Sequence, residues 1–189
     1  MKYIEDQEFK GINFNEQGFE QATYENCIFE QCSFAQVDLA GCRFSECTFR
    51  HCDLSMVGLQ ETGLQECQFE HCKLLALRFD NINPFRFEVA FQHCQLNLSS
   101  FFQCVLRDTV FQECSLQEVD FSEADLSGAQ FDKCDLSKAT FDRTKLEGAD
   151  FRTAVRFVID PTNNFIRKAK FSTEGLIGLV QQFQIEVED

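Results

Sequence analysis

The sequence predicts an all-β solenoid with about 20 residues in each coil, followed by a short helix near the C-terminus. Every fifth residue from Phe91 to Phe151 is Phe or Leu, without exception. Neither the period of an α-helix nor that of a β-strand produces a strict period of five. The choice between Phe and Leu itself repeats at every fourth such position, as at Phe91, Phe111 and Phe131. Four five-residue sides therefore close one coil, and successive coils stack at the spacing of paired strands.

A second inward position lies two residues before each Phe or Leu. It holds a small or modest side chain such as Cys94, Thr109 or Ala129. Residues two apart in an extended side share a face, so both positions point into the rod and the other three face water. All eleven cysteines occupy the small inward position, and we expect them to be reduced core thiols.

Two stretches show the repeat in its purest form. They are Ala124-Asp125-Leu126-Ser127-Gly128 and Ala149-Asp150-Phe151. Both are close matches to the A(D/N)LXX pattern, the second with Phe in place of Leu, and the chain resembles the pentapeptide repeat family over about residues 2–171. The resemblance implies a right-handed, four-sided β-helix. It says less about function, because one fold serves many functions.

The domain organisation follows from breaks in the repeat. A first register runs over about 4–79 and a second over 89–151, and the step between them contains two extra residues near 80–90. Asn83-Pro84 favours a turn there, so we expect either a structural bulge or a small recognition loop. Residues 152–171 form a degenerate last coil of the 1–171 β-helix. Within it we expect a strand over Val155–Ile159 and a turn over Asp160–Asn164.

Residues 172–189 form a separate C-terminal segment. Ser172 is a favourable N-cap residue, and an amphipathic pattern follows it. Its apolar residues are Leu176, Leu179, Val180 and Phe183. Ile185 and Val187 suggest a short final strand. The end of a solenoid exposes its core, so this segment either caps its own rod or mediates a tail-to-tail homodimer, as the gyrase-binding members of the resembled family imply.

The charge of the chain is strongly acidic, with a formal net value of −14. This disfavours direct nucleic-acid binding, which needs clustered Lys and Arg, and favours either a basic protein partner or solubility alone. The N-terminal stretch lacks the regions of a signal peptide and no apolar run could span a membrane. We therefore expect a cytoplasmic protein that does not contact a membrane.

Catalytic, cofactor and metal sites are not predicted. The sequence contains no nucleophile elbow, P-loop or dinucleotide fingerprint, and a rod filled by Phe and Leu leaves little room for a substrate. His51 and His71 should stack on one outer column, without the third ligand that zinc needs. The sequence therefore predicts a protein that is not an enzyme.

The candidate partner-binding residues are acids that gather with only Lys133 among them. They are Glu118, Asp120, Glu123, Asp125, Asp132 and Asp135, and we expect Asp125 to face water. An anionic rod resembles duplex DNA in charge and shape. The Qnr and MfpA branch of the resembled family implies a DNA mimic that binds DNA gyrase or topoisomerase IV, with protection against quinolones or toxins. The alternative is a general interaction or scaffold rod with an unrelated partner.

Overall fold

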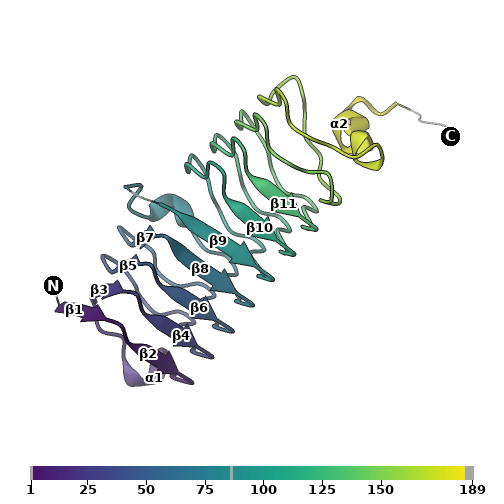
Figure 1. Ribbon diagram of the computed structural model, residues 1–189. Coiled ribbons are helices and arrows are strands. Elements are labelled where there is room, and N and C mark those ends of the chain that lie inside the picture. Colours follow the sequence, from purple (N-terminus) through teal and green to yellow (C-terminus); the bar gives the residue numbers. More distant parts are fainter. Residues whose placement is uncertain (1, 86, 186–189) are drawn as a thin grey trace.

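A computed structural model describes residues 2–85 and 87–185 as a right-handed, four-sided β-helix with a short C-terminal helix (Figure 1). We label the sides by one coil: Phe111 is central on face A, Leu116 on face B, Phe121 on face C and Leu126 on face D. Strands on each face pair in parallel with the same face of the next coil, as Phe111 does with Phe131. The predicted fold class is confirmed.

Faces A and D carry the regular strands. Face A holds a seven-stranded sheet made of β2 (Glu8–Lys10), β4 (Ile28–Glu30), β6 (Thr48–Arg50), β8 (Cys67–Glu70), β9 (Val89–Gln92), β10 (Val110–Gln112) and β11 (Gln130–Asp132). Face D holds a four-stranded sheet made of β1 (Lys2–Glu5), β3 (Ala22–Glu25), β5 (Arg43–Ser45) and β7 (Gly63–Gln65). Faces B and C pair through single bridges, and short helical turns lie at α1 (Phe14–Gln17) and η1 (Phe79–Asn81).

The core is built from columns of stacked side chains. On face A, the ring centroids of Phe111 lie 5.3 Å from Phe91 and 5.2 Å from Phe131, with the rings nearly parallel. Phe121 of face C meets Phe111 edge-on at 6.1 Å. Both geometries are favourable for aromatic pairs, and the rings are fully buried. The predicted inward positions are therefore confirmed.

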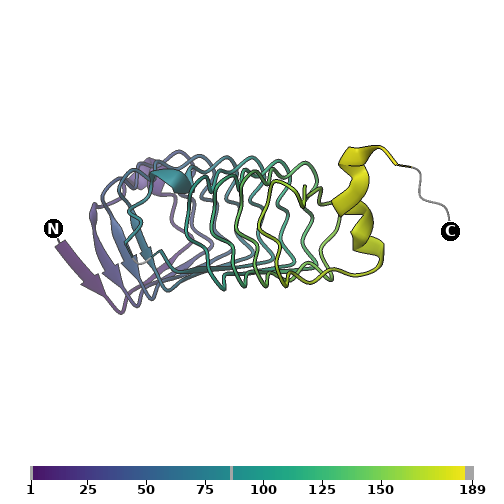
Figure 2. The ribbon, with the colours of Figure 1, turned by 90° about the horizontal axis from the view of Figure 1, so that it is seen from above.

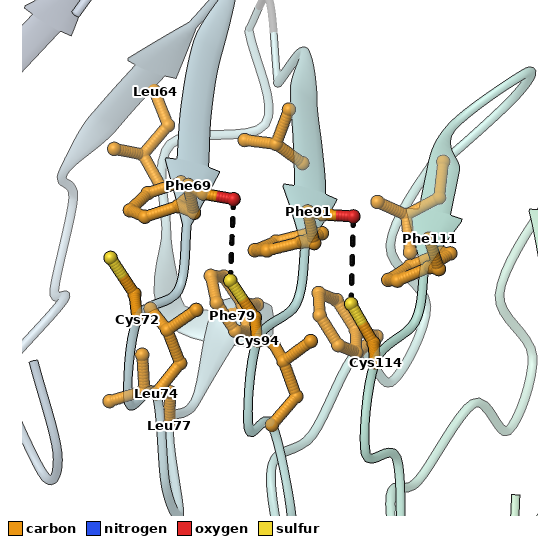
Figure 3. Close-up of a cluster of buried hydrophobic side chains, with 14 of the residues drawn as sticks. Leu64, Phe69, Cys72, Leu74, Leu77, Phe79, Phe91, Cys94, Phe111 and Cys114 are labelled. Atoms are coloured by element: carbon orange, nitrogen blue, oxygen red, sulfur yellow. Dashed lines mark hydrogen bonds between the residues drawn. The ribbon is translucent and has the colours of Figure 1, made fainter. Parts of the chain in front are cut away.

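The small inward positions hold buried side chains between the large ones. All eleven cysteines are buried at these positions, as predicted. The Cys94 thiol donates to the Phe69 carbonyl at 3.3 Å, and the Cys114 thiol donates to the Phe91 carbonyl at 3.5 Å (Figure 3). One column between faces A and B consists of cysteine throughout its middle, at Cys32, Cys52, Cys72, Cys94, Cys114 and Cys134.

The corners of the coil use left-handed backbone. Glu113, Glu118 and Glu123 have φ values of 51°, 57° and 58°, and Gly128 completes that coil at 74°. The backbone N–H of each corner donates to the next coil, as from Glu118 to Ser137 at 2.9 Å. This bond offsets the conformational cost that a residue other than glycine incurs in this region.

The two-residue insertion lies on face D. The Asn83 N–H donates to the Thr62 carbonyl at 2.9 Å, and the Cys67 N–H donates to the Glu88 carbonyl at 3.0 Å, so the extra residues bulge out between these bonds. The Phe87 ring stacks on Phe79 at 6.0 Å. The four-stranded sheet ends at β7, while face A continues without a break.

The last coil departs from the predicted strand over Val155–Ile159. Only Val155 pairs, through a single bridge to Asp135, so that prediction is wrong. The guanidinium of Arg156 turns outward to Asp135, and Phe157 is buried instead. Because a charged residue stands where the repeat expects an inward one, the next residue in the chain, Phe157, occupies the inward position instead. The predicted turn is present at 161–163.

The C-terminal segment lies across the end of the stack (Figure 2). It consists of η2 (Glu174–Leu176), α2 (Ile177–Val180) and η3 (Gln181–Phe183). The Ser172 hydroxyl accepts from the Gly175 N–H at 3.0 Å, as expected of a cap. The Ile159 N–H donates to the Gly178 carbonyl at 3.0 Å, and a Cβ at Gly178 would lie 2.4 Å from the Phe157 carbonyl oxygen. This glycine is what allows the segment to approach the last coil.

The predicted apolar face of this helix is only partly covered. Leu179 packs against the core and Val180 is half-buried, whereas Leu176 and Phe183 are 49% and 52% exposed. Ile185 is exposed and forms no strand, so that part of the strand prediction is wrong. Val187 lies outside the described residues.

Candidate interaction surface

The six candidate acids do not form one patch. They span almost one full coil, so the chain carries them around all four sides. Glu118 lies at the corner of faces B and C, Asp120 on face C, Glu123 at the corner of faces C and D, Asp125 on face D, Asp132 on face A and Asp135 on face B. Neighbours in sequence are therefore separated, and residues at equivalent positions of successive coils are adjacent.

Basic residues from neighbouring coils pair with several of these acids. Lys138 contacts Glu118 at 3.2 Å, and Arg143 contacts Glu123. Lys133, the one base expected among the acids, contacts Glu113 instead at 3.1 Å. The stack thus neutralises much of the charge that appears contiguous in the sequence.

Asp125 does not face water as we expected. Its side chain is only 7% exposed, and it accepts from the Ser127 hydroxyl at 2.7 Å and from the Arg107 guanidinium at 2.8 Å. Lys145 lies 3.7 Å away. Burial raises the pKa of Asp125, but the bonds from Ser127 and Arg107 outweigh it and hold the pKa below its usual range. Asp125 is therefore a structural residue.

Asp135 belongs to a similar network. The Arg156 guanidinium donates to it at 2.9 Å, and Ser137 and Gln117 add hydrogen bonds. The pKa of this carboxyl is lowered, first by Arg156 and then, against the opposing effect of burial, by Ser137 and Gln117. Asp132 and Asp120 are also bonded, to the Thr153 hydroxyl at 2.8 Å and the Ser122 N–H at 2.9 Å.

Face C, with its corner to face D, carries the largest unbalanced charge. The other faces alternate acids and bases, as where Lys10 contacts Glu30 at 2.8 Å on face A. On face C the acids far outnumber the bases and extend along the length of the rod. Its acids are Glu20, Asp38, Glu61, Asp80, Asp120, Glu123, Asp142 and Asp160, and its bases are Arg78 and Arg143. Lys2, from face D, also pairs with Glu20 at 2.7 Å.

The histidine column is longer than the sequence suggested. His51 and His71 stack with ring centroids 4.8 Å apart, and His93 joins them 4.5 Å from His71. The two-residue insertion brings His93 into the same column, which a fixed coil length would not. Within residues 2–85 and 87–185, no group of three or more His, Cys, Asp or Glu side chains has the geometry to hold a metal ion.

Among residues 2–85 and 87–185, no helix is both long enough and apolar enough to cross a lipid bilayer.

The fold and surface together define a four-sided solenoid with a packed apolar interior and charged outer faces. The sequence profile of the pentapeptide repeat region matches residues 22–84 and 87–151. The chain belongs to the pentapeptide repeat family. No curated protein sequence matches it.

Similar solved structures support the fold. Two trypsin-treated variants of QnrB1, a plasmid-mediated fluoroquinolone resistance protein, are 21% and 22% identical to the chain, with TM-scores of 0.50 and 0.52. They cover 99% and 98% of this chain and 100% and 99% of their own. HetL, a protein involved in heterocyst differentiation regulation from the cyanobacterium Nostoc sp., is 17% identical, with a TM-score of 0.59. The match covers 91% of this chain and 88% of HetL.

Proposed function

We propose that the protein is a non-enzymatic interaction protein whose face C binds a basic protein surface. The observation that carries this proposal is the excess of acids along face C, where few bases oppose them. A one-sided charge attracts a partner of opposite charge and orients it. Solubility alone does not require the acids to be concentrated on one face of the rod.

The partner we propose is the DNA-binding surface of a type II topoisomerase, with DNA gyrase as the first candidate. A surface that binds duplex DNA is basic and elongated, and the acids of face C recur along a straight rod. DNA itself carries far more charge per unit length, so binding should weaken steeply with salt but less steeply than DNA binding does. The fold-level likeness to QnrB1 agrees with this choice without identifying the partner.

A scaffold rod with an unrelated partner is the second candidate. Ion pairs between coils balance part of the charge outside face C, and HetL, of the same fold, is described in a different role. The C-terminal segment adds a proposed dimer contact in either case. The exposed Leu176 and Phe183 would be covered by a second copy, which light scattering at micromolar concentration would detect as a doubled mass.

A supercoiling assay tests the topoisomerase proposal. The purified protein is titrated into gyrase from the native host, with and without a quinolone, and either inhibition or relief of the drug supports binding. Glu61→Lys should weaken the effect, whereas Glu66→Lys should not. Both residues are exposed corner residues of one coil, with φ values of 55° and 52°, but only Glu61 borders face C. Equal effects of the two variants would refute a role for face C.

A further inference from the structure

A groove of about 420 Å³ lies where the insertion meets the following coil. We call it the insertion groove. Its apolar walls include Pro84 and Phe87 from the loop and Phe102 and Val105 from the coil, and Asp80 and Gln103 lie at its edge. This volume is within the range of binding pockets, and it accommodates one or two large side chains.

The coil that faces the loop is apolar at two outward positions where the next coil is polar. Phe102 is 36% exposed and Val105 is 56% exposed. In the next coil, Ser122 and Asp125 occupy the same positions of the repeat. The fold therefore does not require apolar residues here, and their exposure has a cost in water that a bound apolar group would offset.

Acids surround the groove on its face C side. Asp80 is already paired with Arg78 at 2.6 Å, and Glu123 accepts from Gln103 at 2.7 Å and is paired with Arg143. Glu61 and Asp120 lie on the same side, in the coils on either side of this region. An apolar centre with a polar, charged rim is the usual arrangement of a protein-binding site, and Glu61 and Asp120 are the acids through which this rim would attract cations.

We propose that the insertion groove receives one large apolar side chain of a Lys- or Arg-rich peptide segment, while the acids of face C bind the flanking cations. This inference rests on the proposed function, because it takes face C as the side that meets the partner. It adds that recognition needs an apolar anchor as well as charge. Duplex DNA offers no such anchor, so the partner must present an apolar side chain beside the cations that bind face C.

The test uses three fluorescein-labelled peptides and the full chain. One peptide is rich in lysine with a central phenylalanine, the second has serine in place of that phenylalanine, and the third has glutamate in place of the lysines. Fluorescence anisotropy gives the dissociation constants. The first peptide should bind at least about tenfold more tightly than the second, since it buries an aromatic ring. The third should not bind.

Matched variants locate the anchor site. Phe102→Ser with Val105→Thr installs the residues found at equivalent positions, Ser122 and Thr23, so the coil should still form, as circular dichroism would verify. This variant should bind the first two peptides equally. Leu98→Gln removes another exposed apolar residue of the same coil, outside the groove, and should keep the tenfold difference.

The outcomes separate this inference from the proposed function. If the phenylalanine gives no advantage, or keeps its advantage in the groove variant, the groove is not an anchor site. That result would leave the supercoiling assay to decide the topoisomerase proposal. If the phenylalanine gives the expected advantage while gyrase supercoiling is unaffected, the groove is an anchor site and the partner is another basic protein.

Discussion

Replacing Asp125 by Lys should destabilise the protein, although the residue lies on an outward position of the repeat. The Asp125 carboxylate accepts two bonds from Ser127, at 2.7 and 3.2 Å, and pairs with Arg107 at 2.8 Å. A lysine would lose these bonds and add a cation beside Arg107 and Lys145. Breaking a buried pair costs about 3–5 kcal/mol. Arg107 is 63% exposed and can turn to water, so we expect the lower limit, about 3 kcal/mol.

Asp125→Asn should cost only about 1 kcal/mol, because an amide oxygen can still accept from Ser127. The assay is urea unfolding followed by circular dichroism, in which a loss of about 3 kcal/mol lowers the midpoint by about 1 M or more. Glu118→Lys is the control, since Glu118 pairs on the exposed surface and should change the midpoint much less. An unchanged midpoint for Asp125→Lys would refute the structural role of this carboxylate.

Phe121→Ala should cost about 3–5 kcal/mol in the same assay, because it empties a fully buried aromatic site, and a neutral result would contradict the inward assignment. Gly178→Ala should detach the C-terminal segment, since its Cβ would collide with the Phe157 carbonyl. Amide hydrogen exchange should then speed up in the last coil, and unchanged protection would mean that the collision is relieved. Asp135 has a lowered pKa, so its contribution is present at neutral pH and is lost as the pH falls below about 4. Unfolding of Asp135→Asn should accordingly depend less on pH between about 4 and 2 than unfolding of the wild type, and parallel curves would argue against the Arg156 pair.

The interior could be predicted from the sequence because it depends on a short, strict period. Two residues in every five point inward, and stacking makes their identity visible as a repeat from coil to coil, as for Phe91, Phe111 and Phe131. The N-cap at Ser172 was also predictable, since capping is local. These features can be predicted without knowing which residues of neighbouring coils lie beside them.

The surface could not be predicted from neighbours in sequence. The basic partners of Asp125 are Arg107, from the coil before it, and Lys145, from the coil after it, so a run of acids such as 118–135 says little about local charge. Arg156 shows the same limit at the end of the rod. Its preference for Asp135 over the core moves Phe157 inward, which a fixed period does not anticipate.

The left-handed corners let the outer charge of the rod evolve independently of its architecture. From Gln31 to Lys133 along the corner between faces A and B, the φ values stay within 51–54° while the side chains change from neutral to acidic to basic. The column reads Gln31, His51, His71, His93, Glu113 and Lys133. No β-branched residue has positive φ among the described residues, because branching at Cβ clashes there. Mutation can therefore reverse a face's charge through unbranched residues alone, and lineages that share this scaffold can diverge in their partners while their coils stay the same.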